Sequence, residues 1–566
     1  MGVTVGIGIQ DFLELRESNN FYIDKTSFIK EWWESNDSVT LITRPRRFGK
    51  TLNMSMVEDF FSLDYANRGD LFEGLSIWEE EKYQKLQGNY PVISLSFANV
   101  KEKDYPSTRK KICRIITDLY VKYSYLRESE TLTDTDRRFF DRILAEDYDD
   151  CDASLTLHYL SYYLTRHHGK KVIILLDEYD TPMQEAYVYG FWEEMVAFIR
   201  NLFNSTFKTN PNLGRAIMTG ITRVSKESVF SDLNNLKVVT TTSDEYATSF
   251  GFTEEEVFAA LDENGMGEEK EKVKEWYDGF VFGGQEDIYN PWSILNYLDT
   301  KKYGTYWANT SSNSLVGKLI REGSEEIKQS MEQLLNGEHL MRPIDEQIVY
   351  NQLNNNEDAI WSLLVASGYL KILSYEDIEK VDRQPNYELA ITNKEVRFMF
   401  RGMISDWFAP AKPSYNGFIK SLLMGDLKTM NKYMRNLTLQ TFSYFDTGKG
   451  VLGEEPERFY HGFVLGLLVD MREDYVLTSN RESGYGRYDV MLEPFDKNKN
   501  AFILEFKVHD PEDEKSIEET VASALNQIEE KQYEANLIAR GIPKDKIRKY
   551  GFAFEGKKVL IGEGKI

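Results

Sequence analysis

The stretch Leu41-Ile-Thr-Arg-Pro-Arg-Arg-Phe-Gly-Lys-Thr51 decides the fold of the N-terminal part of the chain. An apolar run leads into a loop rich in basic residues, and a helical segment follows. Gly49, Lys50 and Thr51 end the pattern G-x-x-x-x-G-K-[ST]. In that pattern the loop N–H groups surround phosphates, the lysine contacts the β and γ oxygens, and the hydroxyl binds Mg²⁺. The sequence therefore predicts a nucleotide site at this loop.

The loop departs from the pattern at its first position, where Arg44 replaces the glycine. Arg46 and Arg47 follow, so the loop carries three guanidinium groups. Because arginine forms paired, charge-assisted hydrogen bonds with phosphate, we expect these side chains to hold part of the phosphate.

A second segment, Lys171-Val-Ile-Ile-Leu-Leu-Asp-Glu178, is an apolar run that ends in two acids. Such a run is typical of a buried parallel strand, and the ligands of parallel sheets gather beyond the carboxyl ends of the strands. We expect Asp177 to bind Mg²⁺, directly or through water, and Glu178 to accept a proton from the water that attacks the γ-phosphate. The alternative is a core strand that ends in an exposed acidic turn.

Strand-like runs alternate with longer helical segments up to about residue 245, which favours an α/β fold with a doubly wound parallel sheet. The five runs are Ser38–Thr43, Val92–Phe97, Val172–Leu176, Arg215–Thr219 and Lys237–Thr242. Thr219 ends the fourth run, and Arg223 follows it. Thr219 could hydrogen-bond a γ-phosphate or the attacking water, and Arg223 could stabilise charge within its own subunit or across a subunit contact. The alternative is a turn hydroxyl and a solvated arginine.

Length and composition indicate a large intracellular protein. The 566 residues exceed what one core usually serves, so we expect three or four domains. The two cysteines, Cys113 and Cys151, show no pairing or metal-ligand spacing, which suggests a reducing compartment. No basic leader and no run of 18 apolar residues occurs, so we expect a cytoplasmic protein without a membrane segment. The net charge of -24 argues against bulk attraction to nucleic acid but leaves room for a local basic groove.

Beyond the predicted sheet the pattern becomes helical. Thr253 and Glu256 have capping-box spacing before an apolar helix face, which predicts the start of a small helical lid. Residues 315–440 look mainly helical and acidic and carry no chemical cluster, so we expect a connector there. The expected domains are a phosphate-loop domain at 1–245, a helical lid at 246–330, a helical connector at 331–445 and a C-terminal α/β domain at 446–566.

Near the C-terminus, Gly486-Arg-Tyr-Asp-Val-Met-Leu492 and Ala501-Phe-Ile-Leu-Glu-Phe-Lys-Val508 predict a hairpin of two strands. Residues two apart on a strand share a face, so Glu505 and Lys507 project together, and Asp489 could face them from the partner strand. Two carboxylates with open positions suit Mg²⁺ or Mn²⁺, and a nearby lysine could orient a water or steady the charge on a phosphodiester. The cluster therefore predicts hydrolytic cleavage of DNA or RNA. The alternative is a structural ion pair, because an unpaired charge is costly in an apolar run.

Further side chains could complete this site. The segment 457–468 is expected to be a helix that presents Glu457 or His461, and we favour Glu457 as an accessory metal ligand. Arg481 and Glu482, in a glycine-bearing turn, could contact phosphate and metal respectively, although a surface ion pair explains them as well.

Taken together, the two ends of the chain resemble a prokaryotic AAA-ATPase-like protein fused to a C-terminal PD-(D/E)XK nuclease superfamily domain. The resemblance covers nearly the whole chain and rests on the order of these motifs: Phe21-Tyr-Ile-Asp-Lys-Thr26, residues 44–51, Leu175-Leu-Asp-Glu-Tyr-Asp180, Thr219-Gly-Ile-Thr-Arg223, Trp276-Tyr-Asp-Gly279, Tyr289-Asn-Pro-Trp292, Asp489 and Glu505-x-Lys507. It implies a P-loop NTPase fold that binds ATP, coupled to a restriction-endonuclease-like α/β fold. The arginine at position 44 looks like this family's own form of the loop. Gln527 and Tyr533 are implied to be the trailing motif of the nuclease fold.

The sequence thus predicts an ATP-dependent or ATP-regulated, metal-dependent nuclease with ATP and nucleic acid as partners, and it is compatible with a homo-oligomer. The alternative is an ATP-dependent switch or scaffold whose nuclease-like domain is inactive and serves in binding. Residues 446–566 favour this alternative, because 18 Lys and Arg stand against 24 Asp and Glu, whereas a nucleic-acid-binding domain is expected to be basic on at least one face. A phosphotransferase that uses the same loop is a third interpretation, disfavoured because nothing resembles a second substrate pocket.

Overall fold

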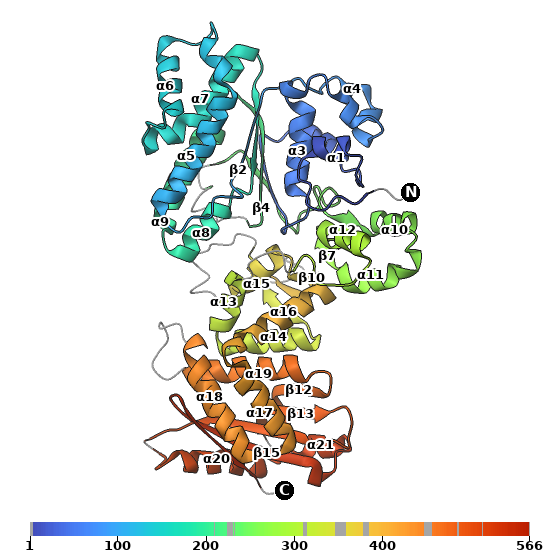
Figure 1. The fold of residues 1–566 in the computed structure, drawn as a ribbon, viewed down its shortest axis with the longest axis vertical. Helices are drawn as coiled ribbons and strands as arrows, with labels where there is room; N and C mark the ends of the chain where they lie inside the picture. The colour runs from blue at the N-terminus through green and yellow to red at the C-terminus, as the bar shows by residue number, and fades with distance from the viewer. Residues whose placement is uncertain are drawn as a thin grey trace. The chain divides into compact units, whose positions relative to one another are not determined.

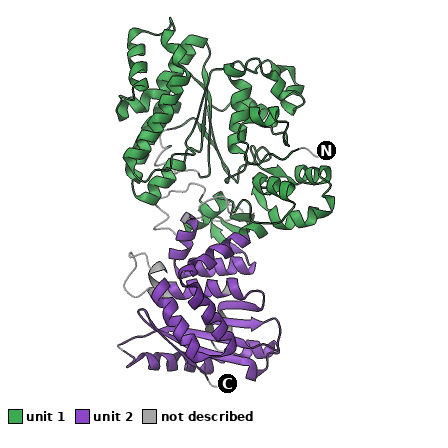
Figure 2. Ribbon diagram, viewed as in Figure 1, with its two compact units in different colours: residues 1–311, 341–396 green, residues 312–340, 397–566 purple. Residues whose placement is uncertain are grey.

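The computed structural model describes residues 4–208, 210–222, 230, 233–308, 314–345, 358–376, 384–445, 455–483, 486–511 and 513–564 (Figure 1). The chain divides into two compact units (Figure 2). Unit 1 comprises residues 1–311 and 341–396, and unit 2 comprises residues 312–340 and 397–566. The predicted connector contributes residues to both units. The four expected domains are a finer division than these two units, and their boundaries stay a prediction.

Unit 1 contains a five-stranded parallel sheet in the order β2-β3-β4-β1-β5. Its strands are β1 (Val39–Thr43), β2 (Val92–Ser96), β3 (Val172–Asp177), β4 (Leu213–Gly220) and β5 (Leu236–Val239). Its helices are α1 (Phe12–Glu17), α2 (Ser27–Ser35), α3 (Lys50–Phe61), α4 (Glu81–Gln84), α5 (Tyr105–Lys122), α6 (Asp134–Leu144), α7 (Asp150–His168), α8 (Thr181–Tyr189) and α9 (Trp192–Phe203). Figure 1 shows α1 and α3 on one side of the sheet and α5 and α7 on the other. Every residue of β1 and β3 is buried, as expected for strands covered on both faces, and the predicted doubly wound parallel sheet is confirmed.

The strand order places β4 between the strand that enters the phosphate loop and the strand that ends in Asp177. Thr43 on β1 pairs with Gly220 on β4, and Met218 on β4 pairs with Leu176 on β3. Thr219 therefore stands at the carboxyl edge of the sheet, the edge at which parallel sheets bind ligands.

A small group of strands and helices follows the parallel sheet within unit 1; it lies in the segment predicted to be a lid and is called the lid below. Strands β6 (Phe252–Thr253), β8 (Gln285–Tyr289) and β7 (Phe280–Phe282) pair in that order, and the lid helices are α10 (Glu254–Glu263), α11 (Lys270–Tyr277) and α12 (Pro291–Thr300). The lid core includes Val257, Leu261, Val273, Tyr277 and Ile294. The predicted capping box is confirmed, because Thr253 N–H donates to Glu256 Oε2 at 2.8 Å and Glu256 N–H donates to Thr253 Oγ1 at 3.3 Å.

The segment expected to be mainly helical also contains strands. Strands β10 (Leu370–Tyr375), β11 (Asn386–Ile391) and β9 (Leu340–Pro343) form a three-stranded sheet in that order, and α15 (Asp358–Ala366) packs against β10. These strands are only four to six residues long, and their mixed polar and apolar content lacks a clear period of two. The helical interpretation of this segment was therefore incomplete.

Unit 2 is built on a mixed sheet in the order β12-β13-β14-β15-β16. The strands are β12 (Tyr475–Ser483), β13 (Gly486–Pro494), β14 (Ala501–Val508), β15 (Ile547–Glu555) and β16 (Lys558–Glu563). Strands β14 and β15 are parallel and are connected through α20 (Ile517–Glu530), whereas the other neighbours are antiparallel. The predicted β13–β14 hairpin and the C-terminal α/β fold are confirmed.

Helices cover both faces of this sheet. The remaining helices are α13 (Ser314–Glu322), α14 (Glu325–Asn336), α16 (Lys394–Trp407), α17 (Lys412–Met424), α18 (Leu427–Phe445), α19 (Glu455–Met471) and α21 (Ala535–Ala539). A Cβ added at Gly551 on β15 would lie 3.1 Å from Ala524 of α20, whereas the next residue, Phe552, contacts Phe418 of α17. Since neighbouring side chains on a strand point to opposite faces, α20 lies on one face and α17 on the other. No helix within the described ranges is both long and apolar enough to cross a membrane.

Candidate active sites

The phosphate loop joins β1 to α3. Gly49 has a φ of 80°, which favours glycine, and a Cβ there would meet no atom within 4 Å. Lys50 is the first residue of α3, and its Nζ donates to the carbonyl oxygens of Arg44 at 3.0 Å and Pro45 at 2.9 Å. Burial lowers the pKa of Lys50. A cationic side chain and open space thus meet at a helix N-terminus, where backbone N–H groups favour anions.

Arg44 is fully buried beneath the loop. Its guanidinium donates to the backbone carbonyls of Thr43 at 2.9 Å, Thr240 at 2.6 Å and Glu245 at 3.2 Å. It also lies 4.6 Å from the centroid of the Phe282 ring, and burial lowers the pKa of Arg44 to about 9. These contacts join the loop to the end of β5 and to the segment after it. The expected phosphate contact by Arg44 stays a prediction, and its Nε has no hydrogen-bond partner among the described residues.

The other two arginines of the loop are more accessible. Arg46 is half-buried, and its Nη2 donates to Gln184 Oε1 at 3.2 Å. Arg47 is exposed, has a φ of 64°, and holds its guanidinium 4.4 Å from the Trp292 ring centroid. Their predicted phosphate contacts are compatible with these positions and stay a prediction.

Three residues predicted from the sequence meet at the carboxylate of Asp177: this residue itself, Thr51 and Thr219. Thr51 Oγ1 donates to Asp177 Oδ2 at 2.8 Å, and Thr219 Oγ1 donates to Asp177 Oδ1. Asp177 is 4% exposed, and burial raises the pKa of its carboxyl. A hydroxyl and a carboxylate at the end of a parallel strand are oxygen ligands that suit Mg²⁺, so the residues present fit the predicted metal.

Glu178 occupies the turn directly after β3. Its φ of 50° is uncommon outside glycine, and its N–H donates to Thr219 Oγ1 at 3.3 Å. The carboxylate accepts a hydrogen bond from Thr181 Oγ1 at 3.2 Å and is half-buried. It therefore lies beside the Asp177 cluster and is accessible to water. Arg223, the second predicted phosphate sensor, lies outside the described residues.

Asp180 supports this edge of the sheet and was not singled out from the sequence. Its buried Oδ2 accepts hydrogen bonds from Ile221 N–H at 3.0 Å, Thr222 N–H at 2.9 Å and Thr222 Oγ1 at 2.9 Å. A Cβ at Gly220 would lie 2.7 Å from the Tyr179 ring, so only glycine allows this close approach. Asp180 is the last acid of the motif Asp177-Glu-Tyr-Asp180, and its hydrogen bonds fix the turn that follows Thr219.

Lid residues hold the backbone of the phosphate loop. Asn290 Nδ2 donates to the Arg46 carbonyl at 3.3 Å, and Trp307 Nε1 donates to the same oxygen at 2.9 Å. Asn290 Oδ1 also caps α12 by accepting from Ser293 N–H at 3.2 Å. The Tyr-Asn-Pro-Trp motif therefore links the start of a lid helix to the loop. The sequence pattern alone did not predict this contact with the loop, because Arg46 and Asn290 are 244 residues apart.

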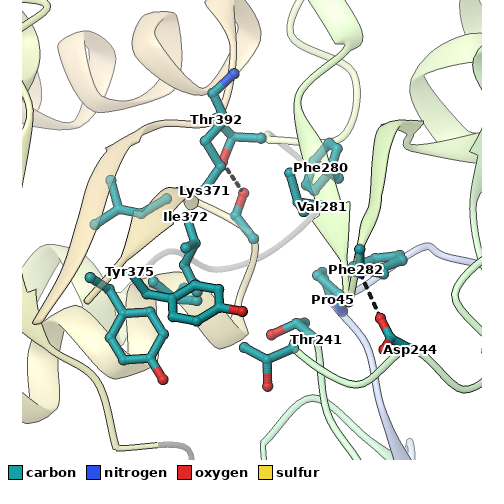
Figure 3. Close-up of a pocket in the computed structure, with 17 residues that line it drawn as sticks. Pro45, Thr241, Asp244, Phe280, Val281, Phe282, Lys371, Ile372, Tyr375 and Thr392 are labelled. Atoms are coloured by element: carbon teal, nitrogen blue, oxygen red, sulfur yellow. Dashed lines mark hydrogen bonds between the residues drawn. The ribbon is translucent and has the colours of Figure 1, made fainter. Parts of the chain in front are cut away.

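A cavity of about 520 Å³ lies beside the phosphate loop within unit 1 (Figure 3). Pro45 contributes to its wall, together with the β7–β8 hairpin and strands β10 and β11. Asp244 lies in the lining and accepts a hydrogen bond from Gly284 N–H at 2.7 Å. The lining includes the aromatic side chains Phe280, Phe282, Tyr375 and Tyr387. Its walls come from segments far apart in the sequence, so no local pattern could predict it.

In unit 2 the predicted carboxylates face each other across β13 and β14. Val490 pairs with Leu504, which places Asp489 opposite Glu505. Asp489 Oδ2 accepts a hydrogen bond from Phe506 N–H at 2.7 Å. Glu505 is 2% exposed, and among the described residues its Oε2 has no hydrogen-bond partner. A buried carboxylate oxygen left unpaired beside a second carboxylate fits a metal cation.

The electrostatics of this pair also favour a cation. Burial raises the pKa of both carboxyls, and the charge of Asp489 raises the pKa of Glu505 further. The charge of Lys507, which shares a strand face with Glu505, acts on both carboxyls in the opposite direction. Within the described ranges, no group of three or more His, Cys, Asp and Glu side chains is arranged to hold a metal. A metal here would therefore need water or further ligands beside Asp489 and Glu505.

Helix α20 positions one of these carboxylates. Gln527 Nε2 donates to Glu505 Oε1 and to the Tyr533 hydroxyl at 3.0 Å, and Tyr533 is 1% exposed. The implied trailing motif is thus brought to the site, where it orients Glu505.

Of the accessory residues predicted for this site, only His461 has a side chain among those that the structure describes. The side chains of Glu457, Arg481 and Glu482 lie outside the part of the chain that the structure describes. His461 is buried, burial lowers its pKa to about 3, and its Nε2 lies 3.2 Å from Glu325 Oε1. Glu325 belongs to α14, in the segment that the sequence assigned to the lid, so its approach to this site could not be predicted.

Comparison with known proteins places the two sites in known domain classes. Residues 6–230 match the family model described as "Predicted AAA-ATPase", and residues 455–564 match the one described as "PD-(D/E)XK nuclease superfamily". The chain therefore combines an AAA-ATPase-like domain with a PD-(D/E)XK nuclease superfamily domain. It is similar to the protein of Azotobacter chroococcum mcd 1 described as "Uncharacterized protein in vnfD 5'region", with 25% identity over 542 residues. The similarity covers 95% of this chain and 94% of that protein.

Proposed function

We propose that this protein binds and hydrolyses ATP at the phosphate loop and that ATP regulates a metal-dependent nuclease site in unit 2. The nuclease substrate is the phosphodiester backbone of DNA or RNA. The protein acts in the cytoplasm, and a homo-oligomer is compatible with this function.

The ATPase part is supported by the meeting of Thr51, Asp177 and Thr219 at the end of the sheet. Bound ATP would supply the bond to be hydrolysed, and bound Mg²⁺ would supply positive charge that stabilises the phosphates. Lys50 would hold the phosphates, Thr51 and Asp177 would hold the metal, and Glu178 would accept the proton of the attacking water. Arg46 and Arg47 contact phosphate, and Arg223 senses the γ-phosphate.

The nuclease part rests on one observation: the buried Oε2 of Glu505, opposite Asp489, has no hydrogen-bond partner in the described part of the chain. Mg²⁺ or Mn²⁺, when bound there, would polarise the phosphodiester and lower the pKa of a water. Asp489 and Glu505 hold the metal with Glu457 as an accessory ligand. Lys507 orients the water or stabilises the charge on the phosphate.

The test is a cleavage assay on supercoiled plasmid, single-stranded DNA and single-stranded RNA, in Mg²⁺ or Mn²⁺, with and without ATP. The full-length protein is compared with Glu505→Ala and with Glu518→Ala, which removes an exposed carboxylate of α20 as a matched control. We expect cleavage by the wild type and the control, and none by Glu505→Ala. A dependence of the rate on ATP would support regulation.

A second candidate function is favoured by the acidic balance of residues 446–566. With 24 Asp and Glu against 18 Lys and Arg, the nuclease-like domain could instead be an inactive binding module in an ATP-dependent switch. Absence of cleavage under every condition, while ATP still binds, would select this function over the nuclease.

A further inference from the structure

Three arginines of unit 2 gather at the C-terminal end of α14. Arg397 and Arg401 lie one turn apart on α16 and therefore share a helix face. Arg472 follows the last residue of α19, and its Nη1 donates to the Leu335 carbonyl at 2.7 Å. A Cβ added at Gly337 would lie 3.9 Å from the Arg397 guanidinium. Arg397, Arg401 and Arg472 are called the arginine cluster below.

The charge of this cluster is poorly balanced. Among the described residues, Arg397 and Arg401 have no hydrogen-bond or ion-pair partner, although both are half-buried. Burial and the charge of Arg472 lower the pKa of Arg397, and burial and both neighbouring arginines lower the pKa of Arg401. Glu473 opposes this effect on Arg401 only in part. Because arginine stays charged in proteins, the cluster presents a repulsive cationic surface that an anion would stabilise.

A structural role explains only one member of the cluster. Cations are favoured near a helix C-terminus, and Arg472 meets this condition through its hydrogen bond to the Leu335 carbonyl. Arg397 and Arg401 make no such hydrogen bond within the described part of the chain. The guanidinium of Arg401 lies over the Phe398 ring, at 5.6 Å from its centroid.

Helix α14 connects this cluster to the candidate nuclease site. Near its N-terminus, Glu325 contacts His461 and its charge acts on Asp489. Farther along, Glu332 accepts a hydrogen bond from Ser479 of β12. The helix packs against α19 (Figure 1). With a rise of about 1.5 Å per residue, Glu325 and Leu335 are roughly 15 Å apart along the helix.

A bound nucleic-acid strand is long enough to span this separation. One strand of a duplex carries a phosphate about every 3.4 Å along the axis, so roughly 15 Å corresponds to four or five steps. A strand that presents one phosphodiester to Asp489 and Glu505 could therefore present another phosphate to the arginine cluster.

We propose that Arg397, Arg401 and Arg472 form a surface that binds the backbone phosphates of the nucleic acid whose phosphodiester is held at Asp489 and Glu505. This inference rests on the proposed nuclease function and names the surface that holds its substrate. Guanidinium groups bind phosphate through paired hydrogen bonds, and such contacts fix the position of the strand without reading its sequence. This surface would be the local basic region that an acidic protein needs in order to bind nucleic acid.

The test measures binding separately from cleavage. The full-length protein carries Glu505→Gln in every arm, so that no substrate is consumed in Mg²⁺. Fluorescence anisotropy of a labelled 30-base-pair duplex is recorded at several salt concentrations for this protein and for versions with Arg397→Gln plus Arg401→Gln, or with Arg401→Gln alone. Arg435→Gln, which removes an exposed arginine of α18, is the matched control. Cleavage by the protein with native Glu505 is measured in parallel.

We expect the double variant to bind at least about 10-fold more weakly, and its salt slope to fall by roughly 2, since each phosphate contact contributes about 0.9. Arg401→Gln alone should show about half of that decrease in slope. This single variant replaces the double variant in the test if the double variant does not fold. Unchanged affinity in folded variants, or an equal loss in Arg435→Gln, would overturn the proposed surface. Weakened binding without any cleavage by the native protein would support the surface and reject the nuclease function. Cleavage by the native protein, together with unchanged binding by the folded variants, would support the nuclease function and reject the surface.

Discussion

Glu178 combines an uncommon backbone conformation with a side chain open to water. Its φ of 50° and the hydrogen bond from its N–H to Thr219 hold it beside Asp177. Conformations of this kind cost energy and concentrate at functional sites. We expect Glu178→Gln to bind ATP normally and to hydrolyse it about 10²- to 10⁴-fold more slowly, because the amide cannot accept the proton of the attacking water.

The measurements are the affinity for a fluorescent ATP analogue and the rate of phosphate release. Lys50→Ala should abolish binding in the first assay, and Glu193→Gln, an exposed change on α9, should alter neither value. Normal hydrolysis by Glu178→Gln would remove this residue from the catalytic role.

Gly220 shows how closely the edge of the sheet is packed. A Cβ there would lie 2.7 Å from the Tyr179 ring and 2.8 Å from Asp180 Oδ1, both of which are buried. We expect Gly220→Ala to destabilise the protein by about 1 to 3 kcal/mol and to slow ATP hydrolysis by displacing Thr219. Gly402→Ala on α16 has nothing within 4 Å and should be neutral or stabilising by up to about 1 kcal/mol. Equal melting temperatures for the two variants would contradict this account.

Local motifs were sufficient for some residues of the site and not for others. Thr51 and Asp177 could be predicted because each belongs to a pattern at the end of an apolar strand. Asp180 could not, since its partners Ile221 and Thr222 reach it only across the sheet. Arg44 was expected at phosphate because of its place in the loop, but burial and three backbone carbonyls determine its position.

At the scale of elements, Glu395 connects the first turn of α16, the part of this helix that belongs to unit 1, with the lid. This buried residue accepts hydrogen bonds from Trp307 N–H at 2.6 Å, Ala308 N–H at 3.3 Å and Ser293 Oγ at 2.7 Å. Burial raises the pKa of Glu395 from 4.5 to about 7, although these donors act in the opposite direction. The folded protein therefore holds a proton that the unfolded chain has already released between pH 4.5 and pH 7.

This proton makes the contribution of Glu395 to stability fall as the pH rises through that window, by at most about 3 kcal/mol. Glu395→Gln removes the titration, and its amide can still donate to Ser293 while its oxygen accepts from the two N–H groups. We expect the melting temperature of the variant, relative to wild type, to rise between pH 5 and pH 7 and then to level off. The difference between the two melting temperatures cancels the contributions of the other titrating groups, which both proteins share. A constant difference across this range would contradict the assignment.

Strand order and length were only partly accessible from sequence. Runs of buried branched residues predicted the strands of the parallel sheet, but β5 ends at Val239 and not at the expected Thr242. The chain turns there because Thr240 N–H donates to Ser243 Oγ and the Thr240 carbonyl accepts from Arg44. Likewise, α14 packs in unit 2 although its sequence follows the lid, and no local pattern specifies which core a helix will join.

At the scale of the whole molecule, the proposed ATP site lies in unit 1 and the proposed nuclease site lies in unit 2. Regulation of one site by the other requires a coupling free energy, and such coupling is reciprocal for binding at equilibrium. If ATP tightens nucleic-acid binding by some factor, nucleic acid must tighten ATP binding by the same factor. The motifs identify each site but carry no information about this factor.

We therefore expect the duplex to change the affinity of a protein with Glu178→Gln plus Glu505→Gln, which consumes neither ligand, for a fluorescent ATP analogue, with a factor in the usual range of about 5- to 150-fold. The same factor should appear when the affinity for duplex is measured with and without ATP. Arg397→Gln plus Arg401→Gln should weaken the effect of a fixed duplex concentration on ATP binding, because less duplex is bound, whereas Arg435→Gln should leave it unchanged. If saturating duplex leaves the ATP affinity unchanged and ATP leaves the duplex affinity unchanged, the two sites bind independently and ATP does not regulate substrate binding.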